Sequence, residues 1–234
     1  MSTQTDTKRI LVLHENGGHH IDFTRRAQPW LDQLAIDENL TLDYRQDTAG
    51  MDDDFFGRYA LVLQLDFPPY AWADVAATSF ERYIDTGRGG WVGLHHASLL
   101  GEFDGYPMWQ SFSTMLGGIR YKNYIPGFAE GEVDVEDGSH PVMRGVPPRF
   151  AVDTEEWYTY DRSPRPNVRV LATVDESTYT PETEVKMGDH PVVWTNPSVA
   201  ARNVYIFMGH SPRLFENDAY VTLLRNAILW GAGC

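Results

Sequence analysis

The fold is decided by a stretch near the beginning of the chain, residues 9–40, which reads RILVLHENGGHHIDFTRRAQPWLDQLAIDENL. Its first six residues, Arg9–His14, form a short and mostly aliphatic run that predicts a buried strand. Apolar residues then recur at helical spacing from Ile21 to Leu40, which predicts an amphipathic helix. A buried strand followed by a helix is the first half of a parallel β–α–β unit.

The same alternation continues along the first half of the chain. Two further aliphatic stretches, Tyr59–Leu65 and Gly90–His96, predict buried strands, and Ala73–Asp85 between them predicts a helix that a glycine-rich turn closes. Strands rich in Val and Leu without polar alternation are typical of parallel sheets covered by helices on both faces. We therefore predict a doubly wound, mostly parallel α/β sheet flanked by helices.

The middle of the chain follows a different pattern. Residues 130–137 place acidic side chains on one side and Val133 and Val135 on the other, which predicts a strand with one face in water. We expect added antiparallel or edge strands in this middle region. The remaining predicted elements are the strands Val168–Val174, Pro191–Thr195 and Asn203–Met208, and a final helix, Asp218–Trp230, that stops at Gly231.

Composition limits the classes of protein to consider. The chain has 234 residues, 19 Lys and Arg against 33 Asp and Glu, and a single cysteine, Cys234, at its last position. We expect one domain over residues 1–234, with a loose tail at 1–7. The net charge of −14, without a basic run, argues against nucleic acid and anionic membranes as partners. The sequence has neither a membrane-spanning stretch nor the apolar core of a secretory signal, which predicts a cytoplasmic protein.

Histidines mark the ends of the predicted parallel strands. Those at strand ends are His14, His95, His96 and His210. The loop after the first strand adds Glu15, Asn16, His19 and His20, of which the paired loop histidines are the weakest candidates. Because parallel strands end at one edge of a sheet, where ligands bind, these imidazoles should converge. A convergent set suits acid/base chemistry or metal ligation, whereas one histidine alone is more often a packing residue.

An acidic and aromatic segment adds further candidates. Residues 153–158, DTEEWY, combine Glu155 and Glu156 with Trp157 and Tyr158. Adjacent side chains of an extended segment point opposite ways, so at most one of the two acids can face a pocket. An acid beside these rings could have a raised pKa, or could bind sugar hydroxyls while the rings stack on a pyranose. The alternative is an ordinary loop whose aromatic rings pack on the core.

Common catalytic motifs are missing from the sequence. Gly17 and Gly18 follow the first strand, but no third glycine completes a dinucleotide-binding fingerprint, so a Rossmann cofactor is not expected. Ser98 follows the third strand outside any G-x-S-x-G elbow, which argues against a serine hydrolase.

Several segments resemble the ThuA-like (trehalose utilisation) domain, whose fold is similar to that of class I glutamine amidotransferases. In chain order they are GGWVGLHHA at 89–97, SHPV at 139–142 with GVP at 145–147, TEEWY at 154–158, HPVVW at 190–194, NVYIFMGHSP at 203–212 and ILWGAG at 228–233. Together they span most of the chain.

The resemblance implies where the site lies. In the amidotransferases, the turn after the strand equivalent to 91–94 carries a cysteine nucleophile, and a His-Pro-Glu segment supplies its base. Here His95 looks like the first position, and His210-Ser211-Pro212 resembles the second. Without a thiolate no acyl-enzyme can form, so glutaminase activity is excluded. The family's association with disaccharide catabolism implies a small-molecule carbohydrate, or a keto-sugar derived from one, as substrate.

Our leading hypothesis is a carbohydrate-metabolising enzyme that uses histidines for acid/base chemistry. His95 or His96, together with His210, would move protons, and Glu155 would orient a histidine or bind the substrate. The candidates for substrate binding are His14, Asn16, His19, Trp157 and Tyr158. A divalent metal such as zinc, held by two or three histidines, could polarise a carbonyl instead.

Two alternatives stay open at this point. One is a non-catalytic sugar-binding or regulatory domain that kept the pocket and lost the chemistry. The other follows from the seven Trp, twelve Tyr and eleven Phe, which are many aromatic residues for one domain and would favour an interface in a homo-oligomer or a larger assembly.

Overall fold

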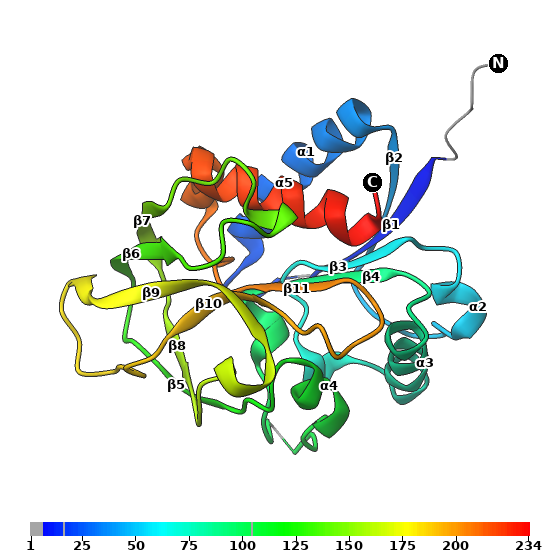
Figure 1. Cartoon of the computed structure of the whole chain (residues 1–234). Coiled ribbons are helices and arrows are strands. Elements are labelled where there is room, and N and C mark those ends of the chain that lie inside the picture. The colour runs from blue at the N-terminus through cyan, green and yellow to red at the C-terminus, as the bar shows by residue number, and fades with distance from the viewer. Residues whose placement is uncertain (1–6, 16, 104) are drawn as a thin grey trace.

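The computed structural model describes residues 7–15, 17–103 and 105–234. Within them, nine strands form one mixed sheet in the order β2-β1-β3-β4-β11-β10-β9-β6-β7 (Figure 1). The sheet is covered on one face by α1 (Ile21–Glu38) and α5 (Asp218–Ala232), and on the other by α3 (Asp74–Asp85) and the short α4 (Gln110–Met115). The predicted doubly wound α/β architecture is confirmed. The predicted tail at 1–7 lies, apart from Thr7, outside the described residues.

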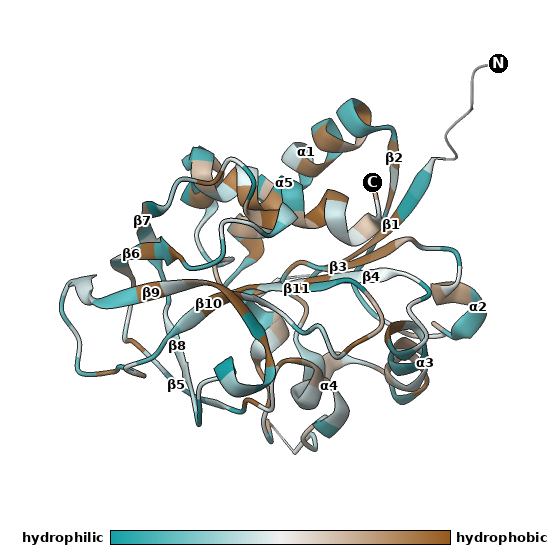
Figure 2. Ribbon diagram, viewed as in Figure 1, coloured by the Kyte–Doolittle hydropathy of each residue, from teal (hydrophilic) through white to brown (hydrophobic). Residues whose placement is uncertain are grey.

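Five neighbouring strands make up the parallel half of the sheet. They are β2 (Leu40–Arg45), β1 (Lys8–Leu13), β3 (Leu61–Gln64), β4 (Gly90–Leu94) and β11 (Asn203–Ile206). Every residue of β3, β4 and β11 is buried, because helices cover both faces of these strands. Figure 2 shows apolar and polar residues interleaved along α1, whose buried side includes Phe23, Ala27 and Leu31.

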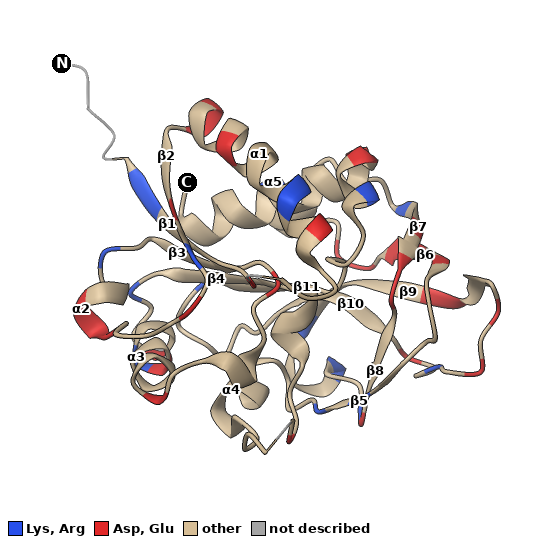
Figure 3. Ribbon diagram, turned by 180° about the vertical axis from the view of Figure 1, so that it is seen from behind, with Lys and Arg blue, Asp and Glu red and all other residues tan. Residues whose placement is uncertain are grey.

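The other half of the sheet is antiparallel, as expected for the middle of the chain. It consists of β10 (Pro191–Thr195), β9 (Arg169–Thr180), β6 (Ala129–Val135) and β7 (Arg149–Glu155). A separate two-stranded ribbon pairs β5 (Tyr121–Tyr124) with β8 (Tyr158–Tyr160). Acidic residues are spread over α1, α2 (Asp53–Phe56), α3 and the outer antiparallel strands (Figure 3). None of the described helices is long and apolar enough to cross a membrane.

Several element boundaries differ from the sequence prediction, and β9 runs on to Thr180 instead of ending at Val174. Helix α1 ends at Glu38 because Asn39 adopts a left-handed conformation, and residues 40–45 form the unpredicted strand β2. Strand β4 ends at Leu94 because His95, with φ of 38°, turns the chain into a short 3₁₀ helix. Helix α5 continues past Gly231 and closes at Gly233, whose φ is 74°. The short strands β5, β7 and β8 were not predicted either.

Helix α5 packs against strand β4 through two glycines. A Cβ atom added at Gly90 would lie 2.2 Å from the carbonyl oxygen of Gly231. Because that obstacle is backbone, it cannot rotate out of the way as a side chain could. Gly90 therefore fixes how closely the last helix approaches the strand that ends at His95.

We predict that Gly90→Ala lowers the free energy of unfolding by about 1–3 kcal/mol, since the added methyl group overpacks the contact between strand and helix. Urea denaturation of wild type and variant measures the difference. Gly138→Ala is the matched control, because its Cβ would meet only Val135 Cγ1 at 3.9 Å. Equal destabilisation by the two substitutions would contradict the close packing at Gly90.

Candidate functional site

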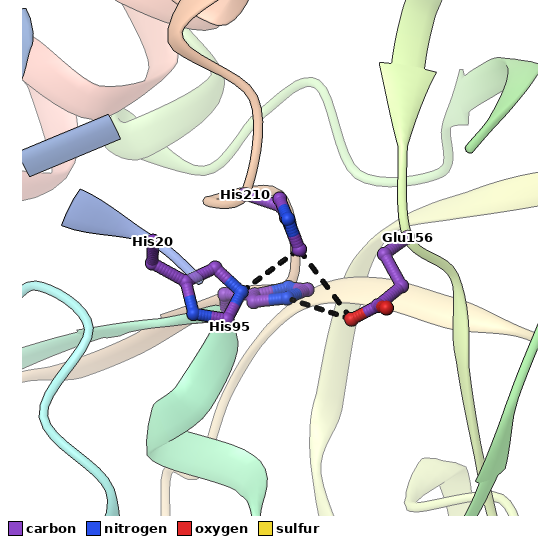
Figure 4. A group of neighbouring side chains, drawn as sticks. All are labelled: His20, His95, Glu156 and His210. Carbon is purple, nitrogen blue, oxygen red and sulfur yellow. Dashed lines mark hydrogen bonds and ion pairs between the residues drawn. The ribbon is translucent and has the colours of Figure 1, made fainter. Parts of the chain in front are cut away.

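Four polar side chains converge at the carboxyl edge of the parallel strands. His20 precedes helix α1, His95 follows β4, His210 follows β11, and Glu156 lies between β7 and β8. Figure 4 shows the three rings and the carboxylate pointing toward one another. One nitrogen or oxygen atom from each of the four lies within 4.8 Å of the others. We call these four residues the histidine cluster.

The histidine cluster is held together by short contacts around His210. His210 Nδ1 lies 2.8 Å from His20 Nε2 and 3.4 Å from Glu156 Oε2. His95 Nε2 lies 3.9 Å from the same carboxylate oxygen. Two buried ring nitrogens of the cluster, His20 Nδ1 and His95 Nε2, have no hydrogen-bond partner among the described residues. A buried polar atom without a partner is costly, and so often marks a ligand position.

The charges in the histidine cluster suit a bound cation. Burial, reinforced by the neighbouring imidazoles, lowers the pKa of His95 to about 3 and the pKa of His20 still further, so both rings are neutral at pH 7. Burial would raise the pKa of Glu156, but contacts with His210 and His95 outweigh this and hold it well below its ordinary value. Neutral imidazoles and an ionised carboxylate are the forms in which these side chains bind metals.

The backbone at His95 is held in an unusual conformation. Its positive φ of 38° is uncommon for a residue other than glycine. The carbonyl oxygen of His95 accepts hydrogen bonds from Tyr205 and Ser98, at 3.0 Å each, which fix the turn. Its Nδ1 lies 3.1 Å from the carbonyl oxygen of Phe207, to which it can only donate. That bond leaves Nε2 unprotonated and facing the Glu156 carboxylate.

Asp66, which follows β3, ties the neighbouring loops together. Its carboxylate accepts hydrogen bonds from the backbone amide of Glu15, at 2.7 Å, and from the Thr24 hydroxyl of α1. Its backbone carbonyl lies 3.1 Å from Nδ1 of His96. Asp66 therefore positions both the loop that carries Glu15 and the ring of His96. Glu15 Oε2 lies 3.5 Å from the same His96 nitrogen.

Of the two adjacent acids, Glu156 faces the pocket and Glu155 lies behind it. Glu155 is fully buried and accepts hydrogen bonds from the backbone amides of Glu156, Gly209 and His210. Burial raises its pKa to about 8 despite these three amides. Glu155 therefore positions His210 through the backbone, which corresponds to the orienting role considered for it. The other role considered, binding of the substrate, needs an acid that lines the pocket, and that acid is Glu156.

The pocket above the histidine cluster has a volume of about 600 Å³. It is lined by His19, His20, His96, Leu99, Phe103, Tyr121, Tyr124, Gly127, Phe128, Glu156, Tyr158 and His210. Two predicted substrate-binding residues, His19 and Tyr158, are thus at this pocket, as are His96 and His210. His95 forms the layer beneath, with its ring 4.3 Å from that of Tyr158.

Two other predicted substrate-binding residues lie elsewhere. His14 lines a different depression, beside Gln28 of α1 and Tyr44 of β2. Trp157 is fully buried and donates its indole N–H to the carbonyl oxygen of Ala129, so it packs in the core. The structure therefore does not bring these two predicted substrate-binding residues to the histidine pocket. Asn16 lies outside the described residues.

The main residue that sequence reasoning undervalues is His20. As one of two paired loop histidines it ranks low, yet its ring contacts those of His96 and His210, with centroids 3.7 and 4.0 Å away. The available signal is its position directly before helix α1, in the loop after the first parallel strand.

A second group, Glu15, His20 and His96, also has the atom spacing of metal ligands.

Comparisons with known proteins find one matching family and several solved structures with the same fold. The family model described as ThuA, trehalose utilisation, matches residues 9–231. A Bacteroides uniformis protein described as ThuA-like is 26% identical with a TM-score of 0.85, and the match covers 98% of this chain and 94% of that one. For a second protein of that description, from Parabacteroides merdae, identity is 22%, TM-score 0.69, and coverage 97% and 90%.

More distant structures show the fold alone. A Thermoplasma acidophilum protein described as belonging to a GMP synthase is 12% identical, with a TM-score of 0.57 and coverage of 98% of this chain and 96% of that one. This match agrees with the expected amidotransferase-like architecture. A comparison with curated proteins gives no match.

We predict a pH dependence of stability that originates at Asp66. Burial raises the pKa of this carboxyl from its ordinary 3.8 to about 6, against the opposing hydrogen bonds from Thr24 and Glu15. Between these two pH values the folded protein keeps a proton that the unfolded chain has released, so the free energy of unfolding falls as pH rises. The fall should reach up to about 1.4 kcal/mol per pH unit.

Asp66→Asn should remove this contribution, because the amide does not titrate and Thr24 can reverse its hydrogen bond. Urea denaturation at pH 4, 5 and 6 measures the difference between wild type and variant. Asp54→Asn, which removes an exposed carboxylate from α2, is the control. If the wild-type and Asp66→Asn stabilities run parallel across this range, the buried carboxyl does not retain its proton.

Proposed function

We propose that this chain, which belongs to the ThuA (trehalose utilisation) family, is an enzyme that acts on a disaccharide or a keto-sugar. Membership of this family gives the chain a role in carbohydrate metabolism. The reaction takes place at the pocket above the histidine cluster and uses a divalent transition metal held there. The observation that supports this most strongly is the convergence of three imidazoles and one carboxylate within 4.8 Å.

The donor set fits a transition metal better than magnesium or calcium. Imidazole nitrogens suit zinc, iron, nickel and copper, whereas Mg²⁺ and Ca²⁺ prefer oxygen ligands. The lone pair of His95 Nε2 and the Glu156 carboxylate face each other at 3.9 Å, an arrangement that repels unless positive charge lies between them. A divalent metal at this position would polarise a sugar carbonyl and lower the pKa of a bound hydroxyl.

His96 is the best-placed base in the pocket. Its Nδ1 donates to the Asp66 carbonyl oxygen at 3.1 Å, which leaves Nε2 as a proton acceptor. The Glu15 carboxylate, 3.5 Å from Nδ1, would stabilise the imidazolium after proton transfer. We assign His96 the removal of a proton from the carbon next to a sugar carbonyl. Such an enolisation needs a base and an electrophile but no covalent nucleophile.

The position of Cys234 argues against the thiolate chemistry of the amidotransferases. Cys234 is exposed at the end of α5, whose last turn contacts Lys8 at the beginning of β1. The pocket lies at the opposite, carboxyl end of the parallel strands. The turn after β4 presents His95 instead of a cysteine.

A non-catalytic sugar-binding domain explains the site less well. A neutral sugar can be bound by hydroxyl, amide and carboxylate groups, and needs no set of desolvated imidazoles. The buried Nε2 of His95 has no partner and faces the Glu156 carboxylate, so it lowers stability unless a ligand satisfies it. This cost favours a site that is completed by a metal.

We predict that protein purified without chelator carries about one equivalent of a divalent transition metal, measured by inductively coupled plasma mass spectrometry. His210→Ala and Glu156→Gln should weaken metal affinity by at least about tenfold, because the first removes a ligand and the second removes the negative charge of one. His140→Ala is the control, since that ring packs against Trp230 outside the pocket. Metal-free protein that also fails to bind added zinc or manganese would refute the metal assignment.

We predict that His96→Ala lowers the turnover of 3-keto-disaccharides by about 10²- to 10⁴-fold while the metal content stays at the wild-type level. Product formation is followed by chromatography, with His140→Ala again as the control. Unchanged turnover in His96→Ala would remove this residue as the base. Saturable sugar binding without any product in the wild type would instead support the non-catalytic sugar-binding domain.

A further inference from the structure

The floor and the walls of the pocket differ in chemistry. The floor is polar and carries His20, His96, His210 and Glu156. The walls are formed by Leu99, Phe103, Tyr121, Tyr124, Phe128 and Tyr158. Among the described residues that line this pocket, none is an aspartate, asparagine, glutamine, lysine or arginine. The imidazoles and the carboxylate therefore lie at the floor, while the walls combine three tyrosine hydroxyls with the apolar side chains of Leu99, Phe103 and Phe128.

This division matters because a sugar ring carries several hydroxyl groups. A hydroxyl that is buried without a hydrogen-bond partner loses its hydration and gains nothing in return. A sugar unit on the floor finds imidazoles and a carboxylate, whereas a second ring along the walls finds mainly aromatic faces. Beside Phe103 and Phe128 a hydroxylated ring finds few hydrogen-bond partners, so this part of the wall suits a flat, apolar group better.

The aromatic wall is pre-organised by ring contacts. The Tyr158 ring lies 5.4 Å from that of Tyr121, which lies 5.6 Å from that of Phe103, and Tyr70 supports Phe103 from behind at 5.3 Å. Rings that are already packed lose little freedom when a ligand stacks on them. The wall is thus ready to accept a ring without rearrangement.

Two further aromatic side chains at the mouth are only half covered. Phe128 is 48% exposed and Tyr124 is 45% exposed, and both line the pocket. The Phe128 ring lies 4.8 Å from that of His210, so it stands next to the histidine cluster. Exposed large apolar groups beside a reactive site are typical of ligand contacts. A ring bound here would cover apolar surface that water now covers.

We infer that the pocket takes glycosides with an aromatic aglycone, whose sugar unit rests on the floor while the aglycone stacks on Phe128 and Tyr124. This rests on the proposed function and specifies its substrate class: aryl glycosides, or their keto derivatives, bind in preference to plain disaccharides. Phe128 and Tyr124 are then the specificity-determining residues.

Isothermal titration of the metal-loaded protein with phenyl glucoside, methyl glucoside and trehalose tests this directly, because binding is read without turnover. Phenyl glucoside should bind about tenfold more tightly than methyl glucoside, and more tightly than trehalose. Phe128→Ala should remove most of that advantage, and Phe128→Tyr should retain it. Tyr124→Ala should reduce it as well. Ile36→Ala, which truncates an exposed apolar side chain of α1 outside the pocket, is the control and should change nothing.

The outcomes separate the two proposals. Equal affinity for phenyl and methyl glucoside, or a preference for phenyl that survives both alanine substitutions, would overturn the aglycone site and leave the proposed sugar chemistry standing. Failure of every glycoside to bind, together with no turnover of keto-sugars, would overturn both. Thermal unfolding of each variant ensures that a lost preference is not a lost fold.

Discussion

The desolvation of three imidazole rings beside one carboxylate is the constraint on which the site depends. Rings at His20, His95 and His210 are brought to one edge because β1, β4 and β11 run parallel and end there. Burial keeps His20 and His95 unprotonated, so they can serve as ligands at neutral pH. The same burial leaves two ring nitrogens without a hydrogen-bond partner. The packing of the core must offset the stability that is lost there.

Two buried acids make this arrangement rigid. Glu155 binds three backbone amides around His210, and Asp66 joins the end of β3 to Glu15, Thr24 and His96. Neither carboxylate lines the pocket, so each acts by positioning other residues. Polar groups that support a site in this way are costly to bury, and their hydrogen bonds allow little displacement.

Sequence patterns predicted the elements whose burial is uniform and missed the short or exposed ones. The aliphatic runs of β3, β4 and β11 and their strand-end histidines were recognisable because helices cover both faces. Strand β2 was missed because none of its residues is fully buried, and only its parallel pairing with β1 marks residues 40–45 as a strand. With β2 unseen, His14 could not be assigned to the edge depression beside Tyr44. The alternation of side chains along an extended segment predicted that only one of Glu155 and Glu156 can face the pocket. Which of the two faces it depends on the register of β7 on β6, which the sequence does not show.

The turn after β4 explains how one fold can serve two chemistries. In the amidotransferases that this chain resembles, that turn carries a cysteine. Here it carries His95, which is fully buried at the carboxyl edge and has a positive φ fixed by Tyr205 and Ser98. The strained turn projects a side chain toward the site whatever its identity, so the scaffold determines position and the residue determines reactivity. A thiolate there forms a covalent bond to the substrate. An imidazole whose Nδ1 is committed to Phe207 can offer only its other nitrogen, so this position can hold a ligand atom but cannot form the acyl-enzyme that a thiolate forms.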